Sequence, residues 1–212
     1  MKNTLDFFLA VGKLKGKQRR GWIVHGLKNS ESTAEHIFRM AILAWVLGNK
    51  KKLNMEKVIK MALIHDICEV YAPDLTPYDP LLPKNPKDPK NIKKILSKWP
   101  KFSLAEKRKR VLKKCEKEMR GLNKLVSELP SKLRVEIKNL WLDFEKGLSP
   151  EGRFVKQIDK AENLLQGLEY WETQGKIQRN LWGRWAKEIF DDPVILEFVQ
   201  TLDKRFIKRK KK

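Results

Sequence analysis

The 212-residue sequence predicts an all-α fold, and three observations support that prediction. Apolar residues recur at helical spacing over most of the chain. Serines stand where several of these segments begin, and prolines or glycines stand where they end. No stretch of useful length alternates apolar and polar residues as a half-buried strand does. We therefore expect helices packed on helices.

The first predicted helix is short and amphipathic and covers residues 3–11. After a basic stretch and a loop, a longer helix begins near Ser32 or Thr33, because either residue suits an N-cap. This helix carries His36. We expect its buried side to be formed by Phe38, Ala41, Ile42, Trp45 and Val46.

The next predicted helix runs from Met55 to Pro73 and contains the neighbouring pair His65 and Asp66. Adjacent residues on a helix point about 100° apart, so both side chains reach one ion only at the edge of the buried face. Glu69 lies one turn further on and places its carboxylate over the same patch. One imidazole and two carboxylates therefore converge. The apolar face of this helix is formed by Val58, Ile59, Ala62 and Leu63.

Further metal ligands must come from other parts of the chain. With three histidines in all, a second imidazole comes from His25 or His36, although a buried His36 held by a core hydrogen bond is the plain alternative. Downstream, Asp159 interrupts an apolar helical rhythm. A buried, unpaired carboxylate is costly, so such an aspartate is usually paired or bound to a metal. Glu162 and Asn163, one turn beyond it, are placed to orient ligands.

The composition changes after Thr76. Five prolines between residues 77 and 89 exclude a long helix or a sheet ladder there. Between Lys84 and Arg120, fifteen basic residues face four acidic ones, so this region carries half of the net charge of +21. We interpret residues 77–110 as a basic insertion. In the favoured interpretation, this segment is a solvated insertion near the mouth of the site. In the alternative, it is a docking surface for an anionic partner.

The remaining predicted helices are defined by caps and breakers. Ser103 and Glu106 form a capping box. Pro130 separates two helices, and Ser149 with Pro150 starts the helix that carries the buried aspartate. In chain order the predicted segments are 91–99, 104–119, 123–128, 132–144, 150–171 and 194–206.

The length suits one domain, which we take as residues 1–212 with the insertion and a basic tail at 207–212. No apolar run approaches the roughly 18 residues that span a bilayer. The start lacks a convincing cleavage site. We expect a cytoplasmic protein without a membrane partner. Cys68 and Cys115 have no zinc-finger spacing and are expected to be reduced, with Cys68 packed in the core.

Four sequence segments together resemble the HD-domain phosphohydrolases, most closely the 5'-deoxynucleotidase branch. They are RRGW, STAEHIFRMA, ALIHDICEVYAPDLTP and FVKQIDKAENLLQ, and the similarity covers residues 13–175. The resemblance implies an HD-domain helical bundle and a catalytic glutamate at Glu69. It implies metal ligands at His36, His65, Asp66 and Asp159.

The resemblance also identifies a substrate loop at Asp74, Leu75 and Thr76. It allows two arrangements for Asp74. In one, the carboxylate has a catalytic role and holds a sugar hydroxyl. In the other, Asp74 reaches a second ion together with Glu69 and the Leu75 carbonyl.

Arg20 and Trp22 stand where the family has an arginine on the phosphate and a tryptophan against the sugar. A guanidinium can fork onto phosphate oxygens, and an indole can cover an apolar sugar edge. The plain alternative is a surface arginine and a core tryptophan. Family members commonly pair, so the resemblance implies a homodimer. Trp182 and Trp185 are candidate anchors for it, and packing in the core is the equally favoured alternative for both.

Two imidazoles and two carboxylates suit Mn²⁺, Co²⁺, Ni²⁺, Fe²⁺ or Zn²⁺ better than Ca²⁺, and Mg²⁺ is a further candidate. The leading hypothesis is a metal-dependent 5'-deoxynucleotidase that uses a metal-activated water to hydrolyse deoxyribonucleoside 5'-monophosphates. The second is an HD phosphohydrolase for a cyclic nucleotide or a nucleoside triphosphate. The third, a nucleic-acid-binding protein that uses the insertion and has a vestigial site, is less favoured, because an unused pocket has no need of four buried polar groups.

Overall fold

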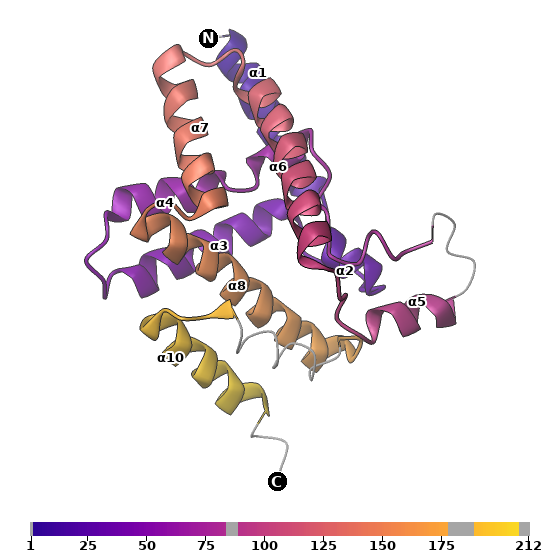
Figure 1. Ribbon diagram of the computed structural model, residues 1–212. Coiled ribbons are helices and arrows are strands. Elements are labelled where there is room, and N and C mark those ends of the chain that lie inside the picture. Colours follow the sequence, from indigo (N-terminus) through magenta and orange to yellow (C-terminus); the bar gives the residue numbers. More distant parts are fainter. Residues whose placement is uncertain (1, 84–88, 178–188, 208–212) are drawn as a thin grey trace.

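The computed structural model describes residues 2–83, 89–177 and 189–207 and confirms the all-α architecture. Within these ranges the only strand-like pairing is one isolated bridge between Gln18 and Ser32. Figure 1 shows the α-helices of the described ranges, of which the long ones cross one another. They are α1 (Lys2–Gly12), α2 (Arg20–Val24), α3 (Thr33–Gly48), α4 (Met55–Ile64), α5 (Pro89–Leu96), α6 (Leu104–Val126), α7 (Ser131–Lys146), α8 (Pro150–Gln174) and α10 (Pro193–Leu202).

The main core lies around α8, which packs against α3, α4, α7 and α10. Met40 of α3, Val58 of α4, Ile158 of α8 and Ile195 of α10 are completely buried in it. This burial of large apolar side chains fixes how the helices cross. The packing therefore brings together α3, the end of α4 and the middle of α8.

A second apolar cluster joins α1, α6 and α7 to the segment after α4. Leu14, Leu122 and Trp141 are almost completely buried there. Cys68 is buried in the same cluster, and both cysteines are free. The expected packing role of Cys68 is confirmed.

Three serine caps were predicted correctly. Ser32, rather than Thr33, is the N-cap of α3 and forms a capping box with Glu35. Ser103 caps α6 in the same way, and Ser149 caps α8 by accepting from the Gly152 amide. Such caps typically stabilise a helix by about 1 kcal/mol each.

The helix α4 ends at Ile64, so the prediction that it continues to Pro73 is wrong. The His65 ring caps the end of the helix, with Nδ1 2.8 Å from the Ala62 carbonyl oxygen. A short 3-10 helix, η2 (Ile67–Val70), follows. A 3-10 helix has fewer residues per turn than an α-helix, so the side chains after His65 point in other directions than α-helical spacing predicts.

The predicted buried side of α3 is also wrong. Of the residues expected to face the core, Ala41 is buried, but the four larger ones lie outside, with Phe38 69% and Trp45 59% exposed. Both faces of α3 are apolar, and the face that packs against α4 and α8 consists of smaller and more flexible side chains. Its completely or nearly buried residues include Ile37, Met40, Ala41 and Ala44.

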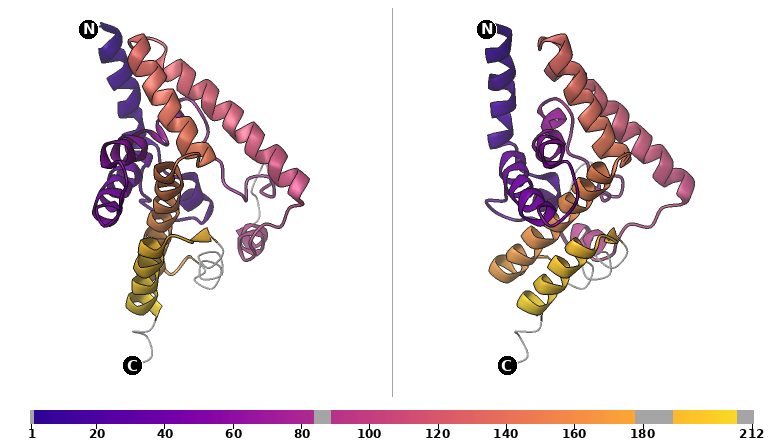
Figure 2. Two further views of the ribbon diagram at one scale, coloured as in Figure 1. Left: turned by 60° about the vertical axis from the view of Figure 1, so that its left-hand side comes forward. Right: turned by 90° about the vertical axis from the view of Figure 1, so that its left-hand side faces the viewer.

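The insertion stands apart from this body. Every residue from Leu104 to Lys113, the first half of α6, is exposed. The second half packs against η2 and α7. Figure 2 shows the start of α6 leaning away from α8, with α5 beside it. No helix in the described ranges is long and apolar enough to cross a membrane.

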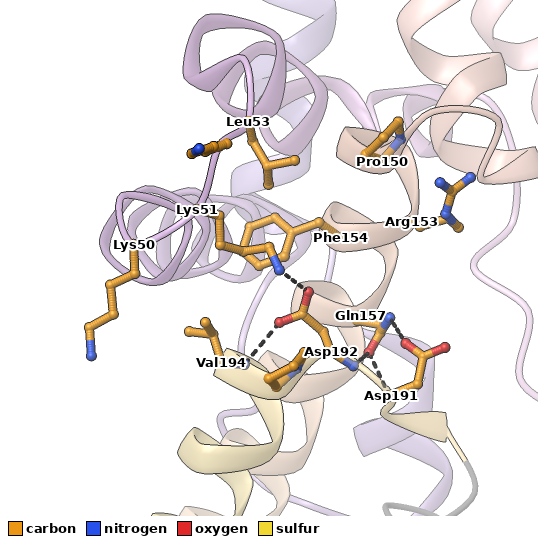
Figure 3. A pocket seen from close by; sticks show the side chains of 12 residues that line it. Lys50, Lys51, Leu53, Pro150, Arg153, Phe154, Gln157, Asp191, Asp192 and Val194 are labelled. Atoms are coloured by element: carbon orange, nitrogen blue, oxygen red, sulfur yellow. Dashed lines mark hydrogen bonds and ion pairs between the residues drawn. The ribbon is translucent and has the colours of Figure 1, made fainter.

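Polar contacts attach α10 to the body, as Figure 3 shows. Asp192 caps α10 and pairs with Lys51 at 2.5 Å. The side chain of Gln157 in α8 donates to Asp191 at 2.6 Å. After α10 a π-helical turn, Asp203–Ile207, ends the described chain.

Candidate active site

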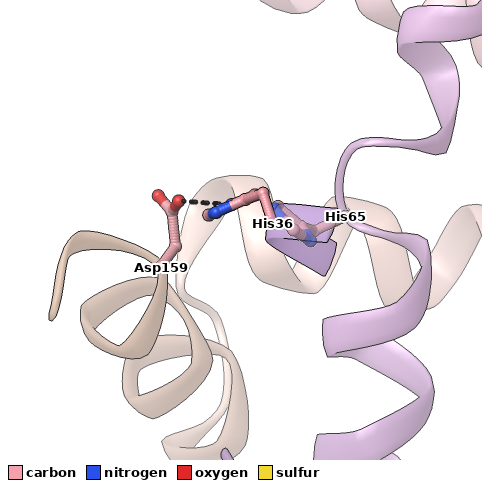
Figure 4. A group of neighbouring side chains, drawn as sticks. All are labelled: His36, His65 and Asp159. Atoms are coloured by element: carbon pink, nitrogen blue, oxygen red, sulfur yellow. Dashed lines mark ion pairs between the residues drawn. The ribbon is translucent and has the colours of Figure 1, made fainter. Parts of the chain in front are cut away.

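Three side chains from three helices meet in the core. His36 comes from α3, His65 from the end of α4, and Asp159 from α8 (Figure 4). The ligand atoms that they offer all lie within 4.8 Å of one another, and His36 Nε2 is 3.3 Å from Asp159 Oδ1. His25, the other candidate imidazole, lies at the end of α2 against Tyr78.

The chemistry of this trio fits a divalent ion. Within the described residues, Nε2 of His36 and Nε2 of His65 are buried and have no hydrogen-bond partner. Buried polar atoms are nearly always satisfied, so two orphaned ring nitrogens beside a carboxylate need an explanation. Mixed imidazole and carboxylate donors are the set that borderline divalent metals prefer.

Asp66, the fourth predicted ligand, lies next to the trio. Its Oδ2 is 3.2 Å from His65 Nε2 and accepts a hydrogen bond from Arg19 Nη1 at 2.5 Å. Burial opposes the charged form, but His65 and Arg19 outweigh it and hold the pKa of Asp66 below its usual range. Asp66 is therefore an ionised carboxylate beside the imidazole.

Arg19, which the sequence analysis did not single out, also points into this group. Its side chain is 11% exposed, and its Nη2 donates to Asn163 at 3.3 Å. Burial opposes its charge, but four surrounding carboxylates raise its pKa above the usual arginine value and keep it protonated: Asp66, Asp74, Glu69 and Asp159.

The backbone explains why Arg19 points inward. The segment before α2 lies antiparallel to the segment before α3, with Arg19 N 3.0 Å from Glu31 O and Thr33 N 2.8 Å from Lys17 O. Side chains alternate along such an extended segment, and α2 begins at Arg20. The doubled arginine was the only signal in the sequence, and it does not say which of the two turns inward.

Arg20 and the predicted substrate loop form their own network. The Arg20 backbone amide donates to Asp74 Oδ2 at 2.7 Å, and its side chain donates to Asp79 at 3.0 Å. Asp79 also accepts from the amide and hydroxyl of Thr76, at 2.6 and 2.9 Å. Leu75, which follows Asp74 in the chain, is half-buried. Thus Asp74 lies at the start of α2, and Arg20 points toward Asp79.

Glu69 is buried and held from two sides. The Thr33 hydroxyl donates to Glu69 Oε2 at 3.0 Å, and Lys17 Nζ is 4.0 Å from the same oxygen. Burial, together with the charges of Asp66 and Asp74, raises the pKa of Glu69 well above its usual range. This carboxyl group therefore binds a proton more readily than a solvated glutamate does.

A second carboxylate orients His36 from behind. Glu162 Oε2 makes a hydrogen bond with His36 Nδ1, and Glu162 Oε1 accepts from Arg39 Nε at 2.8 Å. Arg39 Nη1 in turn donates to Glu169 at 2.7 Å. Although burial and Arg19 oppose it, Asp159 and Glu162 raise the pKa of His36 to about 9. Because Glu162 occupies Nδ1, Nε2 is the nitrogen of His36 that faces Asp159.

Trp22 lies in a small apolar cluster between α2 and the end of α8. It is 3% exposed and its ring centroid is 5.2 Å from that of Tyr170. Its Nε1 donates to Glu31 at 2.8 Å. Burial and the nearby Glu162 raise the pKa of Glu31.

Comparisons with known proteins show the family to which the chain belongs. The model of the HD domain family matches residues 11–183. A Xenopus laevis protein named 5'-deoxynucleotidase HDDC2 is 32% identical over 95% of this chain and 86% of its own length. The human protein of that name is 30% identical over 95% and 85%. A Schizosaccharomyces pombe protein named 5'-deoxynucleotidase hdd1 is 30% identical over 91% and 85%.

Solved structures share the fold. A conserved hypothetical protein from Pyrococcus furiosus superimposes with a TM-score of 0.65 at 24% identity, over 94% of this chain and 99% of its own. A protein from Magnetospirillum magnetotacticum, described as a predicted metal-dependent phosphohydrolase, has a TM-score of 0.65 at 21% identity, over 99% and 93%. The match extends over nearly the whole chain in both cases.

Proposed function

Because the chain belongs to the HD domain family, we propose that it is a metal-dependent 5'-deoxynucleotidase, which releases phosphate from deoxyribonucleoside 5'-monophosphates. The observation that supports this most strongly is the buried trio of His36, His65 and Asp159, with two ring nitrogens that lack partners. Relatives named for this activity are similar over most of the chain.

In this proposal His36, His65, Asp66 and Asp159 hold the divalent ion. Such an ion, when bound, lowers the pKa of a water molecule toward neutrality and polarises a phosphoryl oxygen. Orphaned nitrogens and ionised carboxylates support this donor set. Its mixed nitrogen and oxygen character favours Mn²⁺, Co²⁺, Ni²⁺, Fe²⁺ or Zn²⁺, with Mg²⁺ as a further candidate.

Glu69 orients the attacking water and accepts its proton. Oε2 is occupied by the Thr33 hydroxyl, which leaves Oε1 for the water. The raised pKa of Glu69 supports this role, because it makes the carboxylate a stronger base than a solvated glutamate. Asp74, 2.7 Å from the amide that starts α2, holds a sugar hydroxyl or shares a second ion with Glu69 and Leu75.

We assign the phosphate to Arg19 rather than to Arg20. The guanidinium of Arg19 lies against Asp66 and Asn163, whereas that of Arg20 pairs with Asp79. An inward guanidinium can exchange one carboxylate contact for a phosphate oxygen. Arg20 then steadies the substrate loop. Trp22 is proposed to limit the space beside the sugar, as the family pattern implies.

The proposal includes a homodimer and a cytoplasmic location, in keeping with a nucleotide substrate. Trp182 and Trp185, which the sequence offers either as interface anchors or as core residues, lie outside the described residues. An alternative contact surface is the outer face of α3, where four large apolar residues recur at helical spacing. They are Phe38, Ile42, Trp45 and Val46, and they are 42–69% exposed.

A panel of substrates tests the activity. Phosphate release is measured from deoxy- and ribonucleoside 5'-monophosphates, a cyclic nucleotide and a deoxynucleoside triphosphate, with Mn²⁺, Co²⁺ or Mg²⁺. We expect release that depends on metal, favours deoxy monophosphates and is lost in Asp66→Ala. Asp191→Asn, which changes an exposed acid held by Gln157, serves as the control and should stay active. Turnover of the triphosphate or cyclic nucleotide alone would overturn the substrate assignment, and no release from any substrate would overturn the activity.

A further inference from the structure

The insertion presents a dense positive surface that the catalytic site does not use. We call residues 90–113, from α5 through the first half of α6, the basic arm. Most of its positions are exposed. Within the described part of the chain, eight of its cations form no ion pair: Lys93, Lys94, Lys98, Lys101, Lys107, Arg108, Lys109 and Lys113.

An aromatic residue lies among these cations. Trp99 is 41% exposed and lines a pocket of about 650 Å³ together with Lys94, Lys98 and Lys101. Its ring meets Tyr78 edge to face, with centroids 5.9 Å apart and an interplanar angle of 75°. Tyr78 is 6% exposed, so one edge of the tryptophan packs against a buried side chain.

We propose that the basic arm binds single-stranded nucleic acid, with a base stacked on Trp99 and backbone phosphates on the lysines of its pocket. Aromatic side chains beside a positive groove are the usual means of holding single strands, because every base has a stacking face. The unpaired cations that continue along α6 extend the phosphate-binding surface beyond the pocket. The inference does not depend on the proposed catalytic function.

The charge of the arm and its exposed aromatic residue argue against other occupants. A second copy of the chain would bring like charges together on this surface, which disfavours self-association. The site around Trp99 combines a partly exposed indole with three lysines, and it suits a strand that offers both bases and phosphates better than a lipid surface, which has no base to stack. Stacking requires an exposed base face, which a paired duplex does not offer along its length.

The probe is an oligothymidylate of about twelve nucleotides with a fluorescent label and no terminal phosphate, followed by fluorescence anisotropy. Trp99→Ala should weaken binding about tenfold, within the range measured for lost base stacking. Trp99→Phe should keep most of the affinity, because it keeps an aromatic face. Circular dichroism confirms that each variant keeps its helix content.

The triple variant Lys94→Ala/Lys98→Ala/Lys101→Ala tests the phosphate contacts. It should lower the slope of log affinity against log salt by about two, since each contact with a single strand contributes about 0.7. The matched control removes three cations from the pocket beside α10 in Figure 3, as Lys50→Ala/Lys52→Ala/Arg153→Ala. That pocket is of similar size, about 560 Å³, and Phe154, its aromatic residue, is only 2% exposed.

Two results would overturn the proposal. Equal losses in the two triple variants, with no effect of Trp99→Ala, would mean that binding follows net charge alone. Tighter binding to a duplex of the same length, or to vesicles of phosphatidylglycerol and phosphatidylcholine, would assign the arm to that partner instead. Preference for the single strand, with losses confined to the arm variants, supports it.

Discussion

At the scale of single residues, the decisive feature is that His36 lies between two carboxylates. Asp159 lies on its Nε2 side and Glu162 binds Nδ1, while Arg39 holds Glu162 in place. A hydrogen bond at one ring nitrogen fixes which nitrogen is free for a metal. The affinity for the ion should therefore depend on a residue that does not bind it.

Glu162→Gln should weaken binding of Mn²⁺ or Co²⁺ about 10- to 100-fold, the usual effect of losing a partner of a histidine ligand. Isothermal titration calorimetry measures it directly. Glu169→Gln is the matched control, because Glu169 binds the same Arg39 but its side chain is 41% exposed. Equal affinities in Glu162→Gln and wild type would contradict the orienting role.

The hydroxyl of Thr33 gives a second prediction at this scale. It donates to Glu69 Oε2 at 3.0 Å, so its removal lets the proposed base turn. Thr33→Val should lower kcat for dAMP about tenfold or more and change KM little, whereas Thr33→Ser should keep the rate. Steady-state kinetics decide between them, and an unchanged kcat in the valine variant would argue against Glu69 as the base.

At the scale of elements, the corner between α7 and α8 depends on one glycine. A Cβ at Gly152 would lie 2.3 Å from Asp143 Oδ1 and 2.7 Å from the Asp143 carbonyl oxygen. Asp143 also accepts from the Ser149 amide and hydroxyl, at 2.8 and 2.7 Å, so it has little freedom to move. This corner sets the direction of α8.

Gly152→Ala should lower the free energy of unfolding by about 1–3 kcal/mol, the usual cost of overpacking. Urea denaturation measures the change. Gly12→Ala is the control, because nothing lies within 4 Å of a Cβ built there. If both variants unfold at the same urea concentration as wild type, the close packing at this corner is not as described.

The helix α6 carries a buried acid, Glu118, which is 2% exposed and pairs with Lys114 at 2.8 Å. Its Oε2 has no hydrogen-bond partner within the described residues. Burial outweighs the attraction of the lysine and raises the pKa of Glu118 to about 7. When the pKa of a group is higher in the folded state than in the unfolded state, its protonation favours folding. This contribution to stability is fully present below the unfolded pKa and is lost as the pH rises through the folded pKa.

Glu118→Gln should therefore gain stability relative to wild type between about pH 4.5 and pH 7, by roughly 1–3 kcal/mol in total. Urea denaturation across this pH range gives the difference. Glu116→Gln, on an exposed position of the same helix, should keep the pH dependence of wild type. Parallel stability curves for Glu118→Gln and wild type would contradict the raised pKa.

At the scale of the whole molecule, the outer face of α3 predicts the oligomeric state. Single exposed apolar residues are common on protein surfaces, but a continuous apolar stripe with residues up to 69% exposed indicates a contact surface. If it is the proposed dimer contact, Trp45→Lys should yield a monomer by light scattering. Leu148→Lys, at a residue that is 61% exposed near the start of α8, should leave the mass unchanged. A dimer in both variants would place the contact elsewhere.

Much of the fold was predictable from local signals. The caps at Ser32, Ser103 and Ser149 set the starts of three helices because they satisfy backbone amides that would otherwise lack partners. The convergence of His65 with His36 followed from the resemblance, and the structure places both in one buried group. Which of the predicted residues bind metal or substrate stays a prediction.

The rest depends on tertiary packing. Both sides of α3 are apolar, so only its neighbours decide which side is buried. The break after Ile64 has no proline or glycine to mark it, because the His65 side chain and the 3-10 turn make it. The choice between Arg19 and Arg20 depends on a backbone pairing with the segment before α3, which local sequence does not reveal.

The central claim is that the buried trio is the metal centre of a phosphohydrolase. The most direct measurement is the metal content of the Mn²⁺-reconstituted protein by plasma mass spectrometry, with phosphate release from dAMP measured on the same samples. We predict at least about one ion per chain in wild type, and loss of both metal and activity in His65→Ala. Full activity in His65→Ala without bound metal would contradict the claim.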